Sequence, residues 1–406
     1  MPNRITVVWP DRAPYGPCAA PVVVGRRIRR SVLGTRIGPV THAVMHHASS
    51  PVAVAAHDGV RTDRNSPVTA TILAPGTVAE LVGDAVTAPS MHNAQPWKFV
   101  FSPEGNVLEL HGDPDRAMTR TDPHHRALHL GCAAALFNLR VSAVHHGLRA
   151  RVRLLPDGSR PWLLATVALD GPCDEDHELA ALHSALRRRH TSRFPFGDEP
   201  VPDALMDGLK SAALLEGCRL AVPGDWHMET VLGLVRDAEH REDIDPLVRA
   251  ETSAWAADPH ASTGTPGTPG TPGTRRDGIP AAAFGPRSSA GPSPVRDFGR
   301  DRPAADRGWA VFEKRPQLAL LGTPADTRVD WMRAGQALER VLLQATADGL
   351  ATSMTSQPLE WPELRWTVRD PLEVMGHVQM VLRLGYGPPG PGTPRRSVAD
   401  VLEIHE

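Results

Sequence analysis

Two long apolar segments, each ended by a glycine, constrain the fold of this chain more than any other feature. Residues 126–146 are apolar on nearly every face and stop at Gly147, which predicts a helix buried on all sides. Residues 332–348 stop in the same way at Gly349. When the two glycines are aligned, Ala135-Leu136 falls on Ala337-Leu338. Matching segments at one long interval indicate an internal repeat.

The predicted elements around these helices follow the same order twice. A helix and an apolar strand precede each long helix, and an apolar strand follows it. The other helices are expected at residues 77–86 and 205–215 and from Glu178, where Leu179, Leu182 and Leu186 form the inner face. Strands are expected at residues 97–101, 107–111, 151–155, 162–169, 317–321 and 377–384. The repeated order predicts a chain built of two similar halves.

Two segments lie outside this pattern. Residues 1–66 lack sustained periodicity, and we expect a poorly ordered extension there. Residues 252–306 are loop-like and repeat Thr-Pro-Gly between Thr265 and Gly273, which is typical of a flexible insert. The predicted organisation is therefore an extension (1–66), a first half (67–177) and a second half (178–406) that carries the insert.

The composition narrows the classes of function. Lysine and arginine number 44 against 46 aspartates and glutamates, and this balance argues against a nucleic-acid binder. Four scattered cysteines and no apolar run of about 18 residues favour a cytoplasmic protein without disulfides or a membrane partner. Histidines occur in adjacent pairs that point apart on a helix, and the sequence lacks His-Glu-x-x-His, so no metal site is expected.

Three short motifs carry groups suited to a ligand. They are Ala88-Pro89-Ser90-Met91-His92-Asn93-Ala94-Gln95-Pro96-Trp97, then Arg189-His190-Thr191-Ser192-Arg193, and near the end Gly385-Tyr386 with Pro394-Arg395-Arg396-Ser397-Val398. Arg189 and Arg193 are four residues apart, so they share one face if a helix continues through them. Such a pair suits a phosphate dianion, although basic residues at a helix end also satisfy the helix dipole.

Together these motifs resemble those of the nitroreductase superfamily, in which Pro-Ser-x-x-Asn-x-Gln-Pro-Trp and Arg-x-Ser-x-Arg recur. The chain looks like a member of the Acg family, double-length nitroreductase-like proteins, over residues 68–406 apart from the insert. The resemblance implies an α+β fold with antiparallel central sheets flanked by helices. It also implies that the nitroreductase-type fold is duplicated in one chain, as a pseudo-dimer.

The resemblance further implies one FMN per chain. Ordinary nitroreductases are homodimers in which each flavin takes its ring loop from one subunit and its phosphate arginines from the other. Here the first half has the ring loop and the second half has the arginines. Residues 214–218 stand where a second ring loop would fall, so the twin site is expected to be degenerate.

The cofactor-binding residues follow from these motifs. Ser90 and Asn93 are expected to bond the flavin, Pro89 and Met91 to approach its ring, and Gln95 to bind there or to anchor the loop. The phosphate is expected on Arg189, Thr191, Arg193, Arg395 and Arg396. Family members place a backbone N–H near flavin N5, which corresponds to about Thr355-Ser356-Gln357. No catalytic side chain is assigned, because the flavin supplies the chemistry.

Two functions are compatible with such a site. The first is an NAD(P)H-dependent oxidoreductase that reduces small acceptors such as nitroaromatics or quinones. The alternative is a flavin-storing protein in which the insert lies over FMN as a lid and turnover is slight. The pseudo-dimer is expected to act as a monomer, and further dimerisation stays open.

Overall fold

The computed structural model describes residues 72–171, 176–257, 276–289, 294–299, 307–371 and 375–405. It also describes two short strands, β1 (Arg29–Ser31) and β2 (Gly34–Arg36), which pair antiparallel. These two strands belong to a unit, Met1–Thr69, that is separate from the compact unit Ala70–Glu406. The rest of the predicted extension and the Thr-Pro-Gly tract lie outside the described residues.

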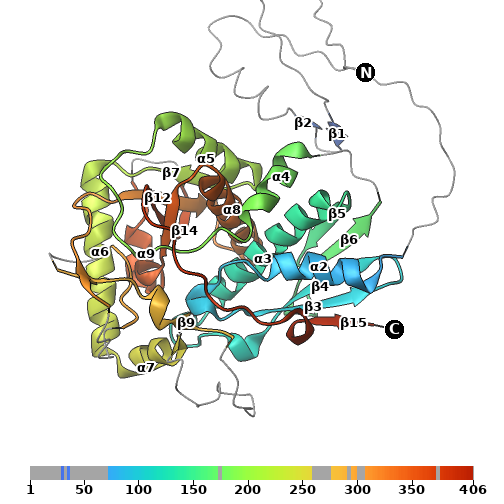
Figure 1. Cartoon of the computed structure of the whole chain (residues 1–406), viewed down its shortest axis with the longest axis horizontal. Coiled ribbons are helices and arrows are strands. Elements are labelled where there is room, and N and C mark those ends of the chain that lie inside the picture. The colour runs from blue at the N-terminus through green and yellow to red at the C-terminus, as the bar shows by residue number, and fades with distance from the viewer. Residues whose placement is uncertain are drawn as a thin grey trace, which may run out of the picture. The chain divides into compact units, whose positions relative to one another are not determined.

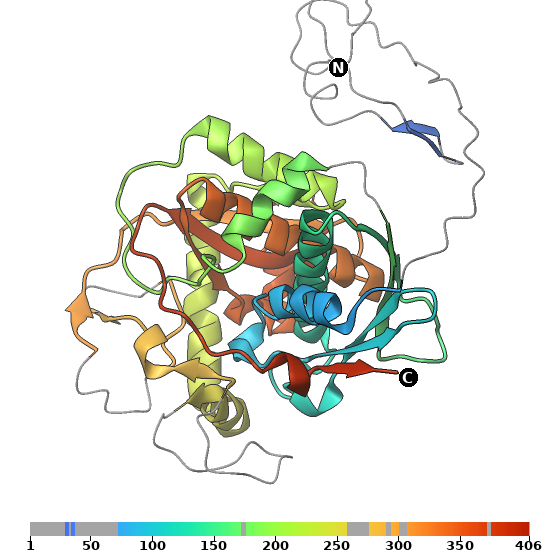
Figure 2. The ribbon, with the colours of Figure 1, turned by 45° about the vertical axis from the view of Figure 1, so that its right-hand side comes forward.

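The first sheet has five strands in the order β15-β3-β4-β6-β5. Their bounds are β3 (Trp97–Ser102), β4 (Val107–Gly112), β5 (Arg149–Leu154), β6 (Leu163–Asp170) and β15 (Leu402–Ile404). Trp97, Phe99 and Phe101 alternate with more exposed residues along β3, and all three are buried in the core. β15 pairs parallel with β3, and the other pairs are antiparallel. The C-terminal segment therefore crosses from the second half to the first sheet (Figure 2).

The second sheet has four antiparallel strands in the order β13-β14-β12-β7. Their bounds are β7 (Arg219–Ala221), β12 (Gln317–Thr323), β13 (Ala351–Thr355) and β14 (His377–Gly385). Strands β12 and β14 are buried along almost their whole length, because helices cover this sheet.

Helices α3 (Arg126–His145) and α8 (Arg328–Ala347) pack against each other between the two sheets (Figure 1). Gly335 permits the close approach, because a Cβ at this position would collide with the carbonyl of Leu130 and the side chain of Ala133. The prediction of two long buried helices is thus confirmed. Helix α3 is long and apolar enough to cross a membrane, and 83% of its apolar window is buried inside the protein, as in a core helix.

Shorter helices surround this centre. They are α2 (Pro75–Ala85), α4 (His177–Ala181), α5 (Asp203–Leu215), α6 (Asp225–Ile244), α7 (Pro246–Trp255) and α9 (Pro362–Thr367). The predicted inner face Leu179, Leu182 and Leu186 is buried, although a 3₁₀ turn (Leu182–Ala185) continues α4. Helices α6, α7 and α9 and strands β7 and β13 were not predicted.

The insert begins later than predicted, because residues 252–255 form the last turn of α7. Its described parts contact both halves, for example through Gly278 and Asn93 of the first half and through Arg296 and Glu360 of the second. β8 (Ala256–Ala257) pairs parallel with β9 (Ile279–Pro280), and Phe284 stacks on Phe298 with ring centroids 6.4 Å apart. These contacts form a small apolar cluster of their own.

Candidate active site

A cavity of about 440 Å³ lies between the two halves. The first half contributes the loop before β3 and the start of α3, and the second half contributes residues around Thr191, β13 and α9. The predicted residues that line it are Pro89, Ser90, Met91, Thr191, Arg193, Ser356 and Gln357. The cavity size falls in the range of small-molecule sites.

The loop of residues 88–97, which we call the ring loop, has an unusual backbone. His92, Asn93 and Gln95 have φ angles of 48°, 56° and 53°, in the left-handed region that costs energy for residues other than glycine. The backbone N–H of Gln95 donates to Oγ of Ser90 at 2.9 Å and closes the loop on itself. Three such residues in one loop persist only because surrounding contacts hold them, a feature concentrated at functional sites.

The side chain of Asn93 ties the ring loop to two distant segments. Its Nδ2 donates to the carbonyls of Gly278 and Pro394, each at 3.0 Å. Its Oδ1 accepts from Nη1 of Arg395 at 3.0 Å. Asn93 is buried and does not line the cavity, so in this structure it positions the loop.

Gln95 makes a similar connection. Its Nε2 donates to the carbonyl of Arg276 at 2.8 Å, and its Oε1 accepts from the backbone N–H of Arg396 at 2.8 Å. The Arg396 guanidinium donates to the carbonyl of Gln95 at 3.2 Å. Neither residue lines the cavity, and this arrangement agrees with the anchoring role weighed for Gln95.

Arg189 and Arg395 form a buried cluster around one carboxylate. Nε of Arg189 lies 3.4 Å from Oε1 of Glu339, and both arginines donate to the carbonyl of Thr87, at 3.1 and 3.0 Å. Burial raises the pKa of Glu339 to about 7 although Arg189 opposes the shift, and burial lowers the pKa of Arg395 to about 9. Nε of Arg395 is buried without a hydrogen-bond partner, so the cluster has donor capacity left over.

Of the two arginines in the basic motif Arg189-His190-Thr191-Ser192-Arg193, Arg193 is the one that lines the cavity. Its Nη1 donates to the carbonyl of Ala283 at 3.0 Å, and its guanidinium lies 4.9 Å from the centroid of Phe298. Burial, and then the charge of Arg296, lower its pKa to about 10. Among the described residues it makes no ion pair with a carboxylate.

Two insert residues also line the cavity. Arg296 donates from Nη1 to Nε2 of His92 at 2.5 Å and from Nη2 to Glu360 at 2.6 Å. Burial, and then Arg296 and Arg193, hold the pKa of His92 well below its usual range, so this imidazole is neutral. Phe298 packs edge-on against His92 at 5.1 Å. Arg296 and Phe298 thus place part of the insert against the ring loop, and its role as a lid over FMN stays a prediction.

The predicted backbone-donor segment lies at the end of β13. Ser356 and Gln357 line the cavity, whereas the buried Thr355 bonds the carbonyl of Pro294 at 3.1 Å. Ser356 donates to Glu360 at 2.8 Å, and Gln357 donates to Glu239 at 3.3 Å. Their side chains are thus occupied with neighbouring acids.

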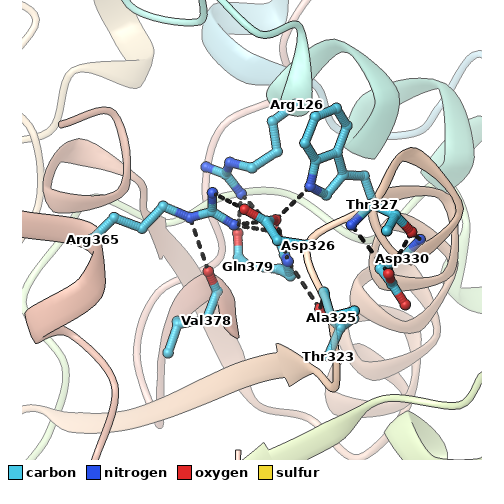
Figure 3. A network of polar contacts seen from close by, with 10 residues as sticks. Arg126, Thr323, Ala325, Asp326, Thr327, Asp330, Arg365, Val378 and Gln379 are labelled. Carbon is cyan, nitrogen blue, oxygen red and sulfur yellow. Dashed lines mark hydrogen bonds and ion pairs between the residues drawn. The ribbon is translucent and has the colours of Figure 1, made fainter. Parts of the chain in front are cut away.

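A second polar group on the cavity wall was not predicted. Arg126, Asp326 and Arg365 line the cavity, and the buried Gln379 bonds all three from behind, as drawn in Figure 3. Arg365 makes two bonds of 2.7 Å to Asp326, and Arg126 donates to the carbonyl of Gln379 at 2.6 Å. The sequence does contain a signal for Arg126. It is the one arginine in the first turn of an apolar helix, where the helix dipole disfavours a cation.

Comparison with known proteins identifies the family. The nitroreductase family model matches residues 186–386. The Mycobacterium tuberculosis protein named "Putative NAD(P)H nitroreductase Rv3131" is 32% identical over 81% of this chain and 92% of its own length. This chain belongs to the nitroreductase family. "Putative NAD(P)H nitroreductase acg" of the same organism is 29% identical over 82% of this chain and 97% of its own length. The predicted family relationship is confirmed.

Solved structures of nitroreductases align with about half of this family member. The FMN-dependent nitroreductase NfnB from Mycobacterium smegmatis, in complex with NADPH, covers 56% of this chain with 14% identity and a TM-score of 0.34. In that alignment 98% of the solved chain is matched. The helices and the mixed sheets described above confirm the α+β fold class.

Among the described residues, no group of three or more histidines, cysteines or acids is arranged to hold a metal ion.

Proposed function

We propose that this chain is an FMN-dependent NAD(P)H oxidoreductase with one flavin in the cavity between its halves. One observation carries the proposal: the ring loop and the basic motif come from different halves and line one cavity. Bound FMN would accept a hydride from the nicotinamide and pass two electrons to a small acceptor such as a nitroaromatic or a quinone. The relatives' names support the same class of reaction.

The basic residues fit a phosphate dianion. Arg193 is a cation at the cavity wall without an ion pair among the described residues, and Thr191 beside it offers a hydroxyl. Arg189 and Arg395 carry two positive charges against the single carboxylate of Glu339. We therefore assign the phosphate to this group, with Arg396 holding the ring loop through Gln95.

Other residues that line the cavity fit a flavin ring. Pro89, Ser90 and Met91 present small, partly apolar surface to the cavity. Ser356 and Gln357 lie on the cavity wall, and a backbone N–H of this segment would have the chemistry to stabilise charge at N5. The buried, neutral His92 keeps an unpartnered Nδ1 beside these residues.

We infer that the chain is a duplicated nitroreductase unit. The order α2, β3, β4, α3, β5, β6 in the first half corresponds to α5, β7, β12, α8, β13, β14 in the second. The spatial order β3-β4-β6-β5 then matches β7-β12-β14-β13. Agreement of both orders supports a pseudo-dimer that acts as a monomer, with the family's interface between the halves.

Anaerobic reduction tests the oxidoreductase proposal. The purified, FMN-loaded protein is mixed with NADPH or NADH, and flavin absorbance is followed before and after a nitroaromatic is added. Bleaching within seconds followed by reoxidation is the expected result. A flavin that stays oxidised for many minutes with both nucleotides contradicts the proposal.

A storage role is the second candidate, because insert residues lie against the ring loop. Arg296 bonds both His92 and Glu360, and Phe298 packs between Arg193 and His92. If these contacts exclude substrate, the flavin is retained and not reduced. Replacement of Phe298 by alanine then distinguishes the two roles: reduction that becomes fast only in this variant favours storage.

A further inference from the structure

The cavity wall carries four arginines and three acids, and their pairing is uneven. The arginines are Arg126, Arg193, Arg296 and Arg365, and the acids are Asp122, Asp326 and Glu360. Arg296 pairs with Glu360, and Arg365 pairs with Asp326. Two arginines therefore remain without an ion pair in the described part of the chain: Arg193, assigned above to the phosphate group, and Arg126.

Asp326 is bonded by three side chains other than Arg126. It receives two bonds of 2.7 Å from Arg365, one of 2.6 Å from Nε1 of Trp331 and one of 3.1 Å from Nε2 of Gln379. Figure 3 shows Arg126 reaching toward the same place from α3, with its guanidinium beside that of Arg365. This group of two guanidiniums and one carboxylate has a net positive charge.

Asp122 is also engaged elsewhere. Its Oδ2 accepts the backbone N–H of Leu128 at 3.0 Å, which satisfies an orphan donor in the first turn of α3. Burial raises the pKa of Asp122, a shift that disfavours its anionic form. Arg126 itself is 6% exposed, and its hydrogen bonds are to the carbonyl and side-chain oxygens of Gln379.

Asp122, Asp326 and Glu360 act on Arg126 from a distance, but none forms an ion pair with it; a buried guanidinium without a direct ion pair is costly, and a bound anion reduces that cost. Resting on the proposed function, we propose that Arg126 binds a carboxylate or phosphate group of the substrate that enters the cavity beside FMN. The binding chemistry is that of a charge-assisted, forked hydrogen bond from a fixed arginine. Arg126 is then a specificity-determining residue that selects anionic substrates over neutral ones of equal shape.

The anionic group that Arg126 binds can belong to the electron acceptor or to the nicotinamide reductant. Pairs of charged and uncharged substrates distinguish these two sources. On the oxidant side, 4-nitrobenzoate is compared with the uncharged 4-nitrobenzamide. On the reductant side, NADPH is compared with 1-benzyl-1,4-dihydronicotinamide, an uncharged hydride donor without phosphates. Each half-reaction is measured by stopped flow on FMN-loaded wild type, Arg126→Gln, Arg126→Lys and, as a control, Arg151→Gln, whose side chain is exposed on β5.

The expected result is a loss of affinity for the charged substrate only. Arg126→Gln should weaken apparent binding of the charged member of one pair by roughly 10- to 100-fold, and should leave the uncharged member within about twofold. Arg126→Lys should restore part of the preference, and Arg151→Gln should match wild type. If Arg126→Gln loses affinity equally for the charged and uncharged members of both pairs, the proposal is overturned, because a purely structural role for Arg126 predicts that result.

Binding without turnover keeps this test separate from the proposed function. Titration of the oxidised protein with benzoate, benzamide and NADP⁺, followed through flavin absorbance, needs no electron transfer. A wild-type preference for an anion that is lost in Arg126→Gln supports the anion site even if NADPH never bleaches the flavin. If Arg126→Gln does not fold, wild type that binds no anion more tightly than benzamide overturns the proposal.

Discussion

The connections that follow α2 and α5 occupy matching places in the two halves and have different structures. Residues 86–96 join α2 to β3 and contain three non-glycine residues with positive φ. Residues 216–218 join α5 to β7, and only Gly217 there has positive φ. The second connection has three residues where the first has eleven, and this difference supports the prediction of a single ring loop per chain.

The place next to the short connection is filled by an ion-pair group. Glu216 accepts from Nη1 of Arg140 at 2.6 Å and lies 3.3 Å from Nε of Arg340. Gln336 adds a bond of 2.8 Å to Arg140. If the two halves arose by the duplication inferred above, the comparison teaches that one copy carries a loop for a ligand and the other carries internal polar contacts at the matching place.

The largest expected effect comes from Arg193, on the flavin side of the comparison. Arg193→Ala should weaken FMN binding by roughly 100-fold, because a charge-assisted contact to the phosphate is lost in a partly enclosed site. Equilibrium dialysis against FMN measures the change, and Arg193→Lys should recover a part of it. Full flavin retention in Arg193→Ala removes this residue from the phosphate group.

The matched control is Arg140, in the ion-pair group around Glu216. Arg140→Ala removes a charge-assisted bond of 2.6 Å and leaves Glu216 with Arg340 as its partner, so the free energy of unfolding should fall by about 2 kcal/mol. FMN affinity should stay within about twofold of wild type. Denaturant titration and dialysis on one preparation check both statements, and a loss of FMN comparable with that of Arg193→Ala contradicts the assignment of the sites.

A smaller effect is expected when Asn93, which holds the ring loop in place, is replaced. Asn93→Ala removes the hydrogen bonds to Gly278, Pro394 and Arg395, and the positive-φ loop loses restraint. FMN affinity should fall roughly tenfold. Dialysis measures the affinity, and faster hydrogen exchange in residues 88–97 should accompany the loss. Unchanged exchange would show that other contacts hold the loop.

The smallest effect on FMN affinity concerns pH. The pKa of Glu339 is raised to about 7 from 4.5, so the folded state holds a proton that the unfolded state releases. Its contribution to the free energy of unfolding therefore falls as the pH rises from about 4.5 to about 7. Glu339→Gln should lack this slope. The variant should also exceed wild type in FMN affinity more at about pH 8 than at about pH 6, because only the ionised carboxylate neutralises Arg189 and Arg395.

Much of the fold was predictable because its strongest elements are apolar and locally bounded. The glycines after α3 and α8 placed both helix ends within about two residues. The start of α8 was placed too late because the capping box of Thr327 and Asp330 precedes its apolar stripe. Helix α6 was missed because charged residues dominate its last turns and only one face is buried.

Parts of the candidate site depend on contacts between distant residues, which sequence patterns do not contain. Strand β13 is short and polar, and it forms because β14 pairs with it. The ring-loop motif predicted Pro89, Ser90 and Met91 on the cavity wall, whereas the role of Asn93 as a tether depends on Gly278 and Pro394. Arg126 was overlooked because its surroundings come from the second half.

The FMN-to-protein ratio tests the central claim most directly. The claim is that one ring loop from the first half and one basic group from the second make a single flavin site per chain. Protein saturated with FMN and freed of excess by gel filtration is analysed for released flavin and for protein by amino-acid analysis. A ratio near one is the predicted result, and a ratio near two would contradict the account.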